Sequence, residues 1–470
     1  MELPPTLAQH IEQSSQQHLL RYWDELDESG RQVLVAELEH IDFALVERLA
    51  GATEVAGSVA DRVARARAPQ NLVTPPTDEE SRNEQRRAVQ AGQDLLRSGR
   101  VGAILVAGGQ GTRLGFDRPK GLFPIGPLSN KTLYQLFAEQ LVARGRQFGP
   151  PIPYFIMTSG ATHAETVAFF EEHDFFGLLP ENVYFFEQGT LPALELDSGR
   201  MLLDQKGRLS LSPDGHGGLV RALARHRLLE EMTLRGIDYL YYHQVDNPSA
   251  PHCDPAFLGW HVLRGADIST KVVRKVSPDE RMGVVCDVDG AAQIIEYSDL
   301  TPEQARTTDA SGQPIFWAGN TAMHVFNREF LERLTETNGE LPFHIARKAV
   351  PYVDDSGQRI VPSQPNARKF EQFIFDALPL ARNALVVEVE RREEFNPVKN
   401  RDGADSPATA RQALIDIHRR WLEAAGAVVE RDVVVEISPL FALDAEEVAA
   451  RLPADSRFAE DTHLEPHLGT

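Results

Sequence analysis

The chain has 470 residues, of which 42% are hydrophobic and 25% are charged, so it can bury a large core and is not disordered as a whole. Its 48 Lys+Arg against 69 Asp+Glu give a net charge of −21, which disfavours nucleic-acid binding but not a local basic site for an anionic small molecule. The two cysteines cannot form a disulfide framework in so long a chain, and no apolar run reaches the ~18 residues of a membrane span. We therefore expect a cytoplasmic protein with no membrane or nucleic-acid partner.

Three regions are expected along the chain. Residues 1–97 have a helical pattern, in which Leu20 and Trp23 repeat at helical spacing. Residues 98–400 alternate strand-like and helix-like segments. Residues 401–470 begin with a helical pattern and continue into a β-rich run, AVVERDVVVEISPLF. The first region is expected to serve packing or oligomerisation rather than chemistry.

A buried, mostly parallel sheet is predicted from residue 101 onward. The run VGAILVAGG is apolar and β-branched and ends in glycines, as expected of a buried strand that leads into a loop. Similar runs follow at 153–160, 182–189, 239–247 and 269–275. Helix-like segments lie at 132–145, 162–173 and 219–236, between the first four of these five runs. Strands that alternate with helices predict a parallel sheet covered on both faces. Farther on, GVVCDVDGAAQIIEYSD predicts a hairpin with a DG turn.

The most informative stretch is the glycine-rich loop LVAGGQGTRLGFDRPKG, from Leu105 to Gly121. Glycine lets a backbone approach a ligand closely because it has no Cβ. Successive free N–H groups in such a loop can form a nest for an anion. Arg113 and Lys120 add two cations to the same loop. Together these features predict a cradle for a triphosphate.

Two better-known phosphate motifs do not fit this loop. A P-loop requires Ser or Thr after the GK pair, whereas Gly121 follows Lys120 here. The dinucleotide fingerprint GxGxxG is missed by one position, because Leu114 stands where the third glycine is needed. A purely structural turn would explain the glycines but not the added Arg and Lys.

The motifs together resemble a known family. AGGQGTRLG followed by PKG resembles the signature of nucleotide-sugar pyrophosphorylases of the UDP-sugar group. In chain order, the segments that resemble successive motifs of the UDP-N-acetylglucosamine pyrophosphorylases are IMTSG, FFEQGTLPA, SPDGHGGLVRAL, VDNP, GVVCDVDG, EYSD, AGN and FNPVKN. The resemblance implies an α/β fold: a GT-A-like, doubly wound, mostly parallel nucleotidyltransferase core over 98–400, an N-terminal helical region and a small C-terminal β-rich region.

The implied reaction joins UTP and a sugar 1-phosphate to give a UDP-sugar and pyrophosphate. Arg113 and Lys120 are the expected catalytic residues, because this chemistry depends on positioning two polyanions and neutralising their charge. Asp246 ends the strand-like run YLYYHQVDN, and it is the implied ligand of Mg²⁺, which prefers carboxylate and phosphate oxygens. No second protein ligand of the metal is evident.

The remaining site residues follow from the resemblance. The expected nucleotide-binding residues are Leu105, Val106, Ala107, Gly108, Gly109, Lys120, Gln188, Gly215, Asp246 and Lys369. The expected substrate-binding residues are His216, Gly283, Glu296, Tyr297, Asn320 and Lys399. Gln188 is expected at the uracil, Glu296 and Asn320 at the sugar, and Lys399 at the sugar phosphate.

The identity of the sugar stays open at this point. His216 replaces the Asn of the eukaryotic N-acetylglucosamine enzymes, and GHG is commoner in UDP-glucose and broad-range UDP-sugar enzymes. The main hypothesis is N-acetylglucosamine 1-phosphate, and a UDP-glucose or broad-specificity enzyme is the first alternative. A non-catalytic, nucleotide-sugar-binding regulator is the alternative of another class. The oligomeric state is not predicted.

Overall fold

The computed structural model describes residues 1–52, 56–336, 341–453 and 455–466. The chain packs as two compact units, each built from segments that are far apart in sequence. Unit 1 comprises Met1–Val59, Gln188–Leu219 and Leu341–Ile374, and unit 2 comprises Ala60–Glu187, Val220–Glu340 and Phe375–Thr470. The predicted region boundaries at residues 97 and 400 stay a prediction, because these two units are defined by packing and combine segments from different parts of the sequence. No helix in the described ranges is long and apolar enough to cross a bilayer.

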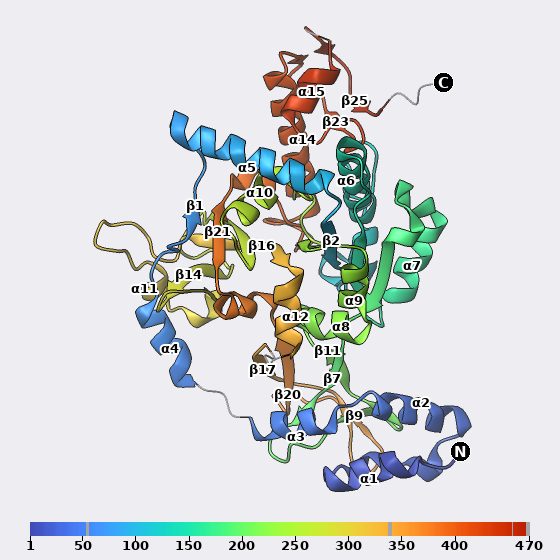
Figure 1. Ribbon diagram of the computed structural model, residues 1–470. Coiled ribbons are helices and arrows are strands. Elements are labelled where there is room, and N and C mark those ends of the chain that lie inside the picture. Colours follow the sequence, from blue (N-terminus) through green and yellow to red (C-terminus); the bar gives the residue numbers. More distant parts are fainter. Residues whose placement is uncertain (53–55, 337–340, 454, 467–470) are drawn as a thin grey trace. The chain divides into compact units, whose positions relative to one another are not determined.

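A ten-stranded sheet forms the centre of unit 2, in the order β1-β21-β13-β16-β12-β2-β5-β6, with a β14–β15 hairpin attached to β16 (Figure 1). The strands are β1 (Leu72–Val73), β2 (Val101–Val106), β5 (Tyr154–Thr158), β6 (Val183–Glu187), β12 (Tyr239–Gln244), β13 (Ile268–Arg274), β14 (Val284–Val288), β15 (Ala291–Ile295), β16 (Ala318–Asn327) and β21 (Ala384–Glu388). Along the main path β16 runs antiparallel to both neighbours, and the other neighbouring pairs are parallel. The predicted mostly parallel sheet is confirmed.

The helices of unit 2 largely follow the predicted segments. They are α5 (Glu79–Arg97), α6 (Leu133–Phe148), α7 (His163–Glu172), α8 (Leu219–Arg225), α9 (Leu228–Leu234), α10 (Pro255–Leu263), α11 (Pro302–Ala305), α12 (Arg328–Glu336), α13 (Arg391–Glu394), α14 (Pro407–Ala424) and α15 (Ala445–Arg451). Helix α5 starts at a capping box made by Asp78 and Ser81 and stops just before Gly99, whose φ of 71° ends it. The single helix expected at 219–236 is two helices, because Arg227 adopts a left-handed φ of 56°.

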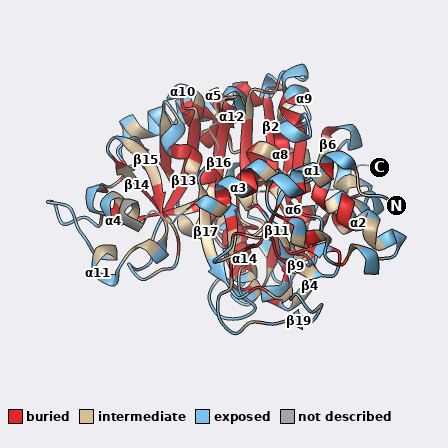
Figure 2. Ribbon diagram, turned by 90° about the horizontal axis from the view of Figure 1, so that it is seen from below, coloured by how far each residue is buried: buried red, intermediate tan, exposed pale blue. Residues whose placement is uncertain are grey.

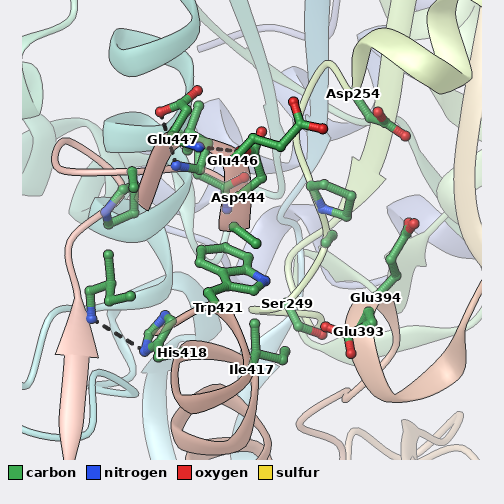
Figure 3. A pocket seen from close by; sticks show the side chains of 18 of the residues that line it. Ser249, Asp254, Glu393, Glu394, Ile417, His418, Trp421, Asp444, Glu446 and Glu447 are labelled. Carbon is green, nitrogen blue, oxygen red and sulfur yellow. Dashed lines mark hydrogen bonds between the residues drawn. The ribbon is translucent and has the colours of Figure 1, made fainter. Parts of the chain in front are cut away.

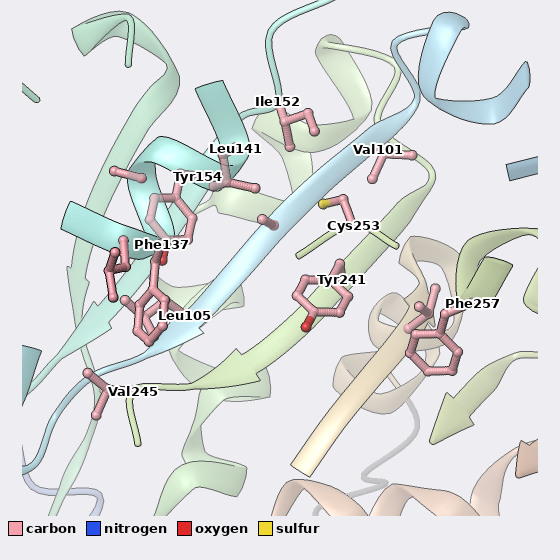
Figure 4. Packing of buried hydrophobic residues seen from close by; sticks show 14 of the residues in the cluster. Val101, Leu105, Phe137, Leu141, Ile152, Tyr154, Tyr241, Val245, Cys253 and Phe257 are labelled. Carbon is pink, nitrogen blue, oxygen red and sulfur yellow. The ribbon is translucent and has the colours of Figure 1, made fainter. Parts of the chain in front are cut away.

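The core of unit 2 is built on the strands β2, β5 and β12, whose residues are almost all buried. Figure 2 shows β2 among the buried strands of the sheet. Large aromatic side chains fill it, among them Phe137, Tyr154, Tyr241 and Phe257, each at most 1% exposed (Figure 4). The free thiol of Cys253 lies in the same cluster. A sheet packed this densely holds the ends of its strands in fixed positions.

Two buried histidines occupy the same core. His252 Nε2 lies 3.1 Å from His243 Nδ1, and Tyr154 Oη lies 3.2 Å from His243 Nε2. Burial lowers the pKa of His243 to about 3. Burial, followed by the neighbouring His243, lowers the pKa of His252 well below its usual value. Both rings are therefore neutral at physiological pH.

Helices α5 and α10 touch through their backbones in unit 2. A Cβ added to Gly259 would lie 1.7 Å from the Ala88 carbonyl oxygen, and one added to Gly92 would lie 1.8 Å from the Pro255 carbonyl oxygen. Neither position can hold a larger residue unless the helices separate. Figure 1 shows the two helices lying together against the sheet.

The C-terminal segment of unit 2 is fastened to the segment that precedes α6. It contains α14, α15, β22 (Val428–Val429), β23 (Val435–Ile437), β24 (Arg457–Phe458) and β25 (Thr462–Leu464). The buried carboxylate of Glu436 accepts the N–H groups of Leu128 and Ser129, at 2.6 and 2.7 Å. The buried Lys131 ammonium donates to Glu139, at 2.8 Å, and to Ser438, at 3.1 Å.

Unit 1 combines the first helices of the chain with small antiparallel sheets. Its elements are α1 (Pro5–Gln13), α2 (Glu28–Glu39), α3 (Phe43–Gly51), β7 (Thr190–Pro192), β8 (Leu194–Glu195), β9 (Leu203–Gln205), β10 (Arg208–Leu209), β11 (Leu211–Pro213), β17 (Phe343–Lys348), β18 (Tyr352–Val353), β19 (Arg359–Ile360) and β20 (Ala367–Gln372); α4 (Ala56–Arg65) spans the boundary with unit 2. Residues 17–25 form two short 3-10 turns rather than the expected continuous helix. They bury Leu19 and Tyr22, whereas Leu20 and Trp23 are only half-buried.

Acidification is expected to destabilise the fold through His243. Its folded-state pKa lies below the ordinary 6.5, so the unfolded chain binds a proton that the folded chain does not as the pH falls below that value. Between pH 7 and pH 5 this histidine should cost about 2 kcal/mol of unfolding free energy. His243→Gln should be less stable than wild type at pH 7, yet lose about 2 kcal/mol less on acidification. Urea denaturation at both pH values tests this, and equal losses would contradict it.

Gly259→Ala should weaken the α5–α10 contact. The new methyl group overlaps a backbone oxygen that no rotamer change can move, so we expect the free energy of unfolding to fall by about 3 kcal/mol. Gly51→Ala is the matched control, since a Cβ at Gly51 would meet nothing within 4 Å. Thermal denaturation of both variants measures the difference, and a Gly259→Ala protein as stable as Gly51→Ala would contradict this account of the contact.

Candidate active site

The predicted glycine-rich loop leaves the sheet at the carboxyl end of β2. Its backbone is held by bonds from the Ala107 N–H to the Met157 carbonyl, at 2.8 Å, and from the Lys120 N–H to the Gly109 carbonyl, at 3.1 Å. The Ser159 hydroxyl donates to the Gly108 carbonyl, at 2.7 Å. A Cβ at Gly109 would meet no protein atom within 4 Å, so nothing in the protein's own packing requires glycine there. A ligand that approaches the backbone would require it.

The structure brings together Arg113, Lys120, Asp246 and Lys399. Burial lowers the pKa of the Lys120 ammonium, the negative charge of Asp246 opposes that shift, and the positive charges of Lys399 and Arg113 add to it. Within the described ranges, no residue forms a hydrogen bond or ion pair with the Lys120 ammonium or the Arg113 guanidinium. Three cations near one another, two of them without a counter-ion, form a site that attracts a polyanion.

Asp246 follows β12, the parallel neighbour of β2, and Gln244 of β12 pairs with Val106 at the end of β2. Asp246 and the glycine-rich loop therefore leave the sheet at the same edge. This edge, outside the carboxyl ends of parallel strands, is where ligands of open α/β sheets bind. The sequence prediction placed Asp246 at the end of this strand, and the structure agrees.

Asp246 fits a Mg²⁺ ion that is held mainly by substrate phosphates. No group of three or more His, Cys, Asp or Glu side chains able to hold a metal occurs among the described residues. Mg²⁺ usually keeps several waters and takes only one or two protein carboxylates, with phosphate oxygens completing its shell. The half-buried Asp246 beside a cationic phosphate site offers one such carboxylate.

Gly283, Glu296 and Asn320 lie together near the β14–β15 hairpin. The Asn320 N–H donates to the Gly283 carbonyl, at 2.9 Å, and a Cβ at Gly283 would lie 2.8 Å from a Glu296 carboxylate oxygen. The side-chain oxygen of Asn320 accepts the Ala322 N–H, at 3.1 Å. Asn320 stands at the start of β16, which is antiparallel to β12, so it lies toward the sheet edge from which Asp246 emerges. Tyr297 follows Glu296 and is 46% exposed.

Gln188, Gly215 and His216 belong to unit 1. Gln188 is buried. Gly215 has a φ of 84°, and an added Cβ would lie 2.4 Å from the Gln372 carbonyl oxygen. Lys369 lies on β20 opposite Ala346, and no described contact joins it to Gln188 or His216, so its role stays a prediction.

His216 is a neutral hydrogen-bonding group. Its Nδ1 accepts the Ile374 N–H, at 3.1 Å, and its ring stacks on Phe373 with centroids 5.3 Å apart. Burial, followed by the charge of His344, lowers the pKa of His216 to about 4. Since Nδ1 accepts, the proton of the neutral ring is on Nε2. This protonation state suits a donor to a ligand oxygen and does not suit a base.

Sequence reasoning missed two buried residues beside the predicted site. Asn247 is 3% exposed and bonds to the chain around Glu394 and Asn396. Lys271 is 1% exposed and pairs with Asp254 and Glu394, at 2.8 and 2.6 Å. Asn247 follows directly on Asp246, and a lysine inside the apolar run STKVVRK is a signal that could have been noticed.

A separate cavity of about 710 Å³ in unit 2 contains none of the predicted site residues. Carboxylates lie around Trp421 at its wall, among them Asp254, Glu394, Asp444 and Glu446 (Figure 3). Such a lining repels a triphosphate. The cationic cluster at Lys120, and not this cavity, is therefore the candidate substrate site.

Comparisons with known proteins identify the family. Residues 58–464 match the family described as UTP--glucose-1-phosphate uridylyltransferase. The chain is 43% identical over 434 residues to the UDP-N-acetylhexosamine pyrophosphorylase-like protein 1 of Homo sapiens, covering 89% of this chain and 85% of that protein. It is 41% identical over 357 residues to the UDP-N-acetylglucosamine pyrophosphorylase of Saccharomyces cerevisiae, covering 74% and 75% of the two chains.

Among solved structures, the uridine diphosphate N-acetylglucosamine pyrophosphorylase of Trypanosoma brucei in complex with an inhibitor is similar, with a TM-score of 0.81 and 26% identity over 96% of this chain and 97% of that one. A putative UDP-N-acetylglucosamine pyrophosphorylase of Entamoeba histolytica gives a TM-score of 0.73 and 31% identity, over 83% and 100% of the two chains. The chain therefore belongs to the UTP--glucose-1-phosphate uridylyltransferase family and is a nucleotidyltransferase.

Proposed function

We propose that the chain is a uridylyltransferase that joins UTP and N-acetylglucosamine 1-phosphate to give UDP-N-acetylglucosamine and pyrophosphate. The observation that carries this proposal is the cluster of Arg113, Lys120 and Lys399 beside Asp246, at the edge of a mostly parallel sheet. The relatives from Homo sapiens and Saccharomyces cerevisiae, which are named for N-acetylated sugars, support the N-acetylated substrate over glucose.

The reaction is an in-line displacement at the α-phosphorus of UTP. An oxygen of the sugar phosphate attacks, and pyrophosphate leaves on the opposite side. No covalent nucleophile of the protein is required, so the residues serve to align two polyanions and neutralise their charge. Arg113 can contact phosphate oxygens in a bidentate manner, and Lys120 supplies a point charge at the triphosphate.

Lys399 holds the phosphate of the attacking sugar in this proposal. Its ammonium lies 5.4 Å from the centroid of the Phe395 ring. Asp246 is the protein ligand of Mg²⁺, which when bound supplies further positive charge to the phosphate oxygens. The backbone of the glycine-rich loop, from Leu105 through Gly109, contacts the nucleotide.

The sugar is bound in this proposal by the group at Gly283. The Glu296 carboxylate accepts hydrogen bonds from sugar hydroxyls, and Tyr297 flanks them. Since the Asn320 oxygen already accepts a backbone N–H, its amide NH₂ group is the part that recognises the acetamido carbonyl or a hydroxyl.

The uridine contacts in this proposal are made by Gln188 and Gly215. The Gln188 amide can both donate to and accept from uracil, and the Gly215 backbone supports the ribose and base. His216 donates from Nε2, and Lys369 contacts a phosphate. We further propose a GT-A-like, doubly wound core and a cytoplasmic location, which the two buried free thiols support.

The test is pyrophosphate release from UTP and Mg²⁺ with a panel of sugar 1-phosphates. The panel contains the 1-phosphates of N-acetylglucosamine, N-acetylgalactosamine, glucose and galactose. Release that is selective for the N-acetylated sugars is expected. Equal or faster release with glucose 1-phosphate would replace the proposal by a UDP-glucose or broad-range enzyme. UTP binding without release from any sugar would favour a non-catalytic binder.

Arg113→Ala and Lys120→Ala should each lower kcat by about 100-fold, comparable to the loss of one transition-state donor. Arg118→Ala is the matched control, because Arg118 lies in the same loop but is exposed and paired with Glu165 at 2.5 Å. That variant should stay within about 3-fold of wild type, as expected when an exposed ion pair is removed. Steady-state rates with saturating substrates provide the comparison, and full activity of Lys120→Ala would refute its assigned role.

A further inference from the structure

Lys399 belongs to a short irregular segment, residues 395–400, which we call the Lys399 loop. No helix or strand is assigned to the described residues of this loop. It is attached to the chain that follows β12, because the Val398 N–H donates to the Asp246 carbonyl, at 2.7 Å. Asp246, the proposed metal ligand, and Lys399, the proposed ligand of the sugar phosphate, therefore belong to two segments that a backbone hydrogen bond joins.

The Asn247 side chain makes the other bonds between these segments. Its Nδ2 donates to the Glu394 carbonyl, at 2.7 Å. Its Oδ1 accepts the Asn396 N–H, at 3.1 Å, and the Ser249 hydroxyl, at 3.0 Å. Both functional groups of the amide are engaged, and the residue is 3% exposed, so it does not contact a substrate.

Glu394, the residue just before the Lys399 loop, is held by the buried Lys271 ammonium. The Glu394 carboxylate accepts from Lys271, at 2.6 Å, and the same ammonium donates to Asp254, at 2.8 Å. Lys271 is part of strand β13, and Asp254 caps α10 by accepting the Ala256 N–H. The Lys399 loop thus starts from a rigid point, and Asn247 connects that point to Asp246.

We propose that Asn247 is a positioning residue that fixes the Lys399 loop relative to Asp246. This proposal rests on the proposed function, in which Lys399 binds the sugar phosphate. In this arrangement Asn247 acts through hydrogen bonds to backbone groups at both ends of residues 394–396. These bonds set the direction in which the chain continues to Lys399. A displacement of about 1 Å in such a group can cost about 100-fold in rate.

The amide is required because one side chain must donate and accept at once. An aspartate of the same size keeps the acceptor for Asn396 and Ser249 but has no N–H for the Glu394 carbonyl. It also places a negative oxygen against that carbonyl oxygen, so the segment is pushed away from Asn247. Asn247→Asp is therefore the informative substitution.

The first experiment compares Asn247→Asp with wild type under the pyrophosphate-release assay. We expect kcat/KM for N-acetylglucosamine 1-phosphate to fall by about 100-fold, with the KM for UTP within about 3-fold of wild type because Arg113 and Lys120 lie on a different segment. Asn327→Asp is the matched control. Asn327 also donates to a backbone carbonyl, that of Ala266 at 2.8 Å, but it lies at the opposite end of β12, against Tyr239.

The second experiment separates positioning from a general loss of stability. In a Lys399→Ala background, Asn247→Asp should cost less than about 3-fold, since residues that act as a unit are strongly non-additive. Losses that multiply in the double variant would overturn the proposal, as would wild-type kinetics of Asn247→Asp or an equal loss in Asn327→Asp.

Wild type, Asn247→Asp, Lys399→Ala and the double variant are compared for binding of UDP-N-acetylglucosamine by calorimetry, which does not need turnover. Asn247→Asp should weaken binding by about 10-fold when Lys399 is present, as expected for a weakened charge-assisted contact, and not when it is absent. This coupling in a protein without turnover would reject the proposed function and retain the positioning role. Turnover without this coupling would retain the proposed function and reject the positioning role.

Discussion

Burial of positive charge is the constraint on which the site depends. Burial is the main cause that lowers the pKa of the Lys120 ammonium; Asp246 opposes this shift, and the charges of Lys399 and Arg113 add to it. The packed sheet and the hydrogen bonds that hold the loops keep these groups in place. A bound polyanion supplies negative charge to this buried cationic site, which favours its binding. The cluster is also a local exception in a chain of net charge −21.

Buried hydrogen bonds and ion pairs connect the sheet to the loops that hold these charges. Lys271 links β13 to α10 and to Glu394, and removing Lys271 would leave two buried carboxylates without their cation. The Asp246 carbonyl and the Asn247 amide continue the chain of contacts to Lys399. Each link is a donor matched to an acceptor, which defines distance more sharply than apolar packing does.

Local patterns in the sequence predicted most of the sheet. The runs at β2, β5, β6, β12 and β13, the β14–β15 hairpin and the placement of Asp246 at a strand end all follow from short segments. The break at Arg227 and the 3-10 turns of residues 17–25 could not be predicted, because tertiary packing overrides helical periodicity there. Asn247 and Lys271 were missed for a related reason: Glu394, the partner that they share, lies more than one hundred residues away in the chain. The roles of Gln188, Lys369 and Tyr297 remain predictions.

The contact between Glu436 and the segment before α6 has a consequence for how the protein is made. The N–H groups of Leu128 and Ser129 meet their acceptor only when Glu436 is in place, and the buried Lys131 ammonium gains its bond to Ser438 at the same time. Strand β21 likewise enters the sheet between β1 and β13, long after both have been synthesised. During synthesis, β1 and β13 therefore each keep an unpaired edge until β21 has emerged from the ribosome. Removal of residues 436–438 would leave the N–H groups of Leu128 and Ser129 without their acceptor, so this segment is part of the scaffold of unit 2 and not a separable module.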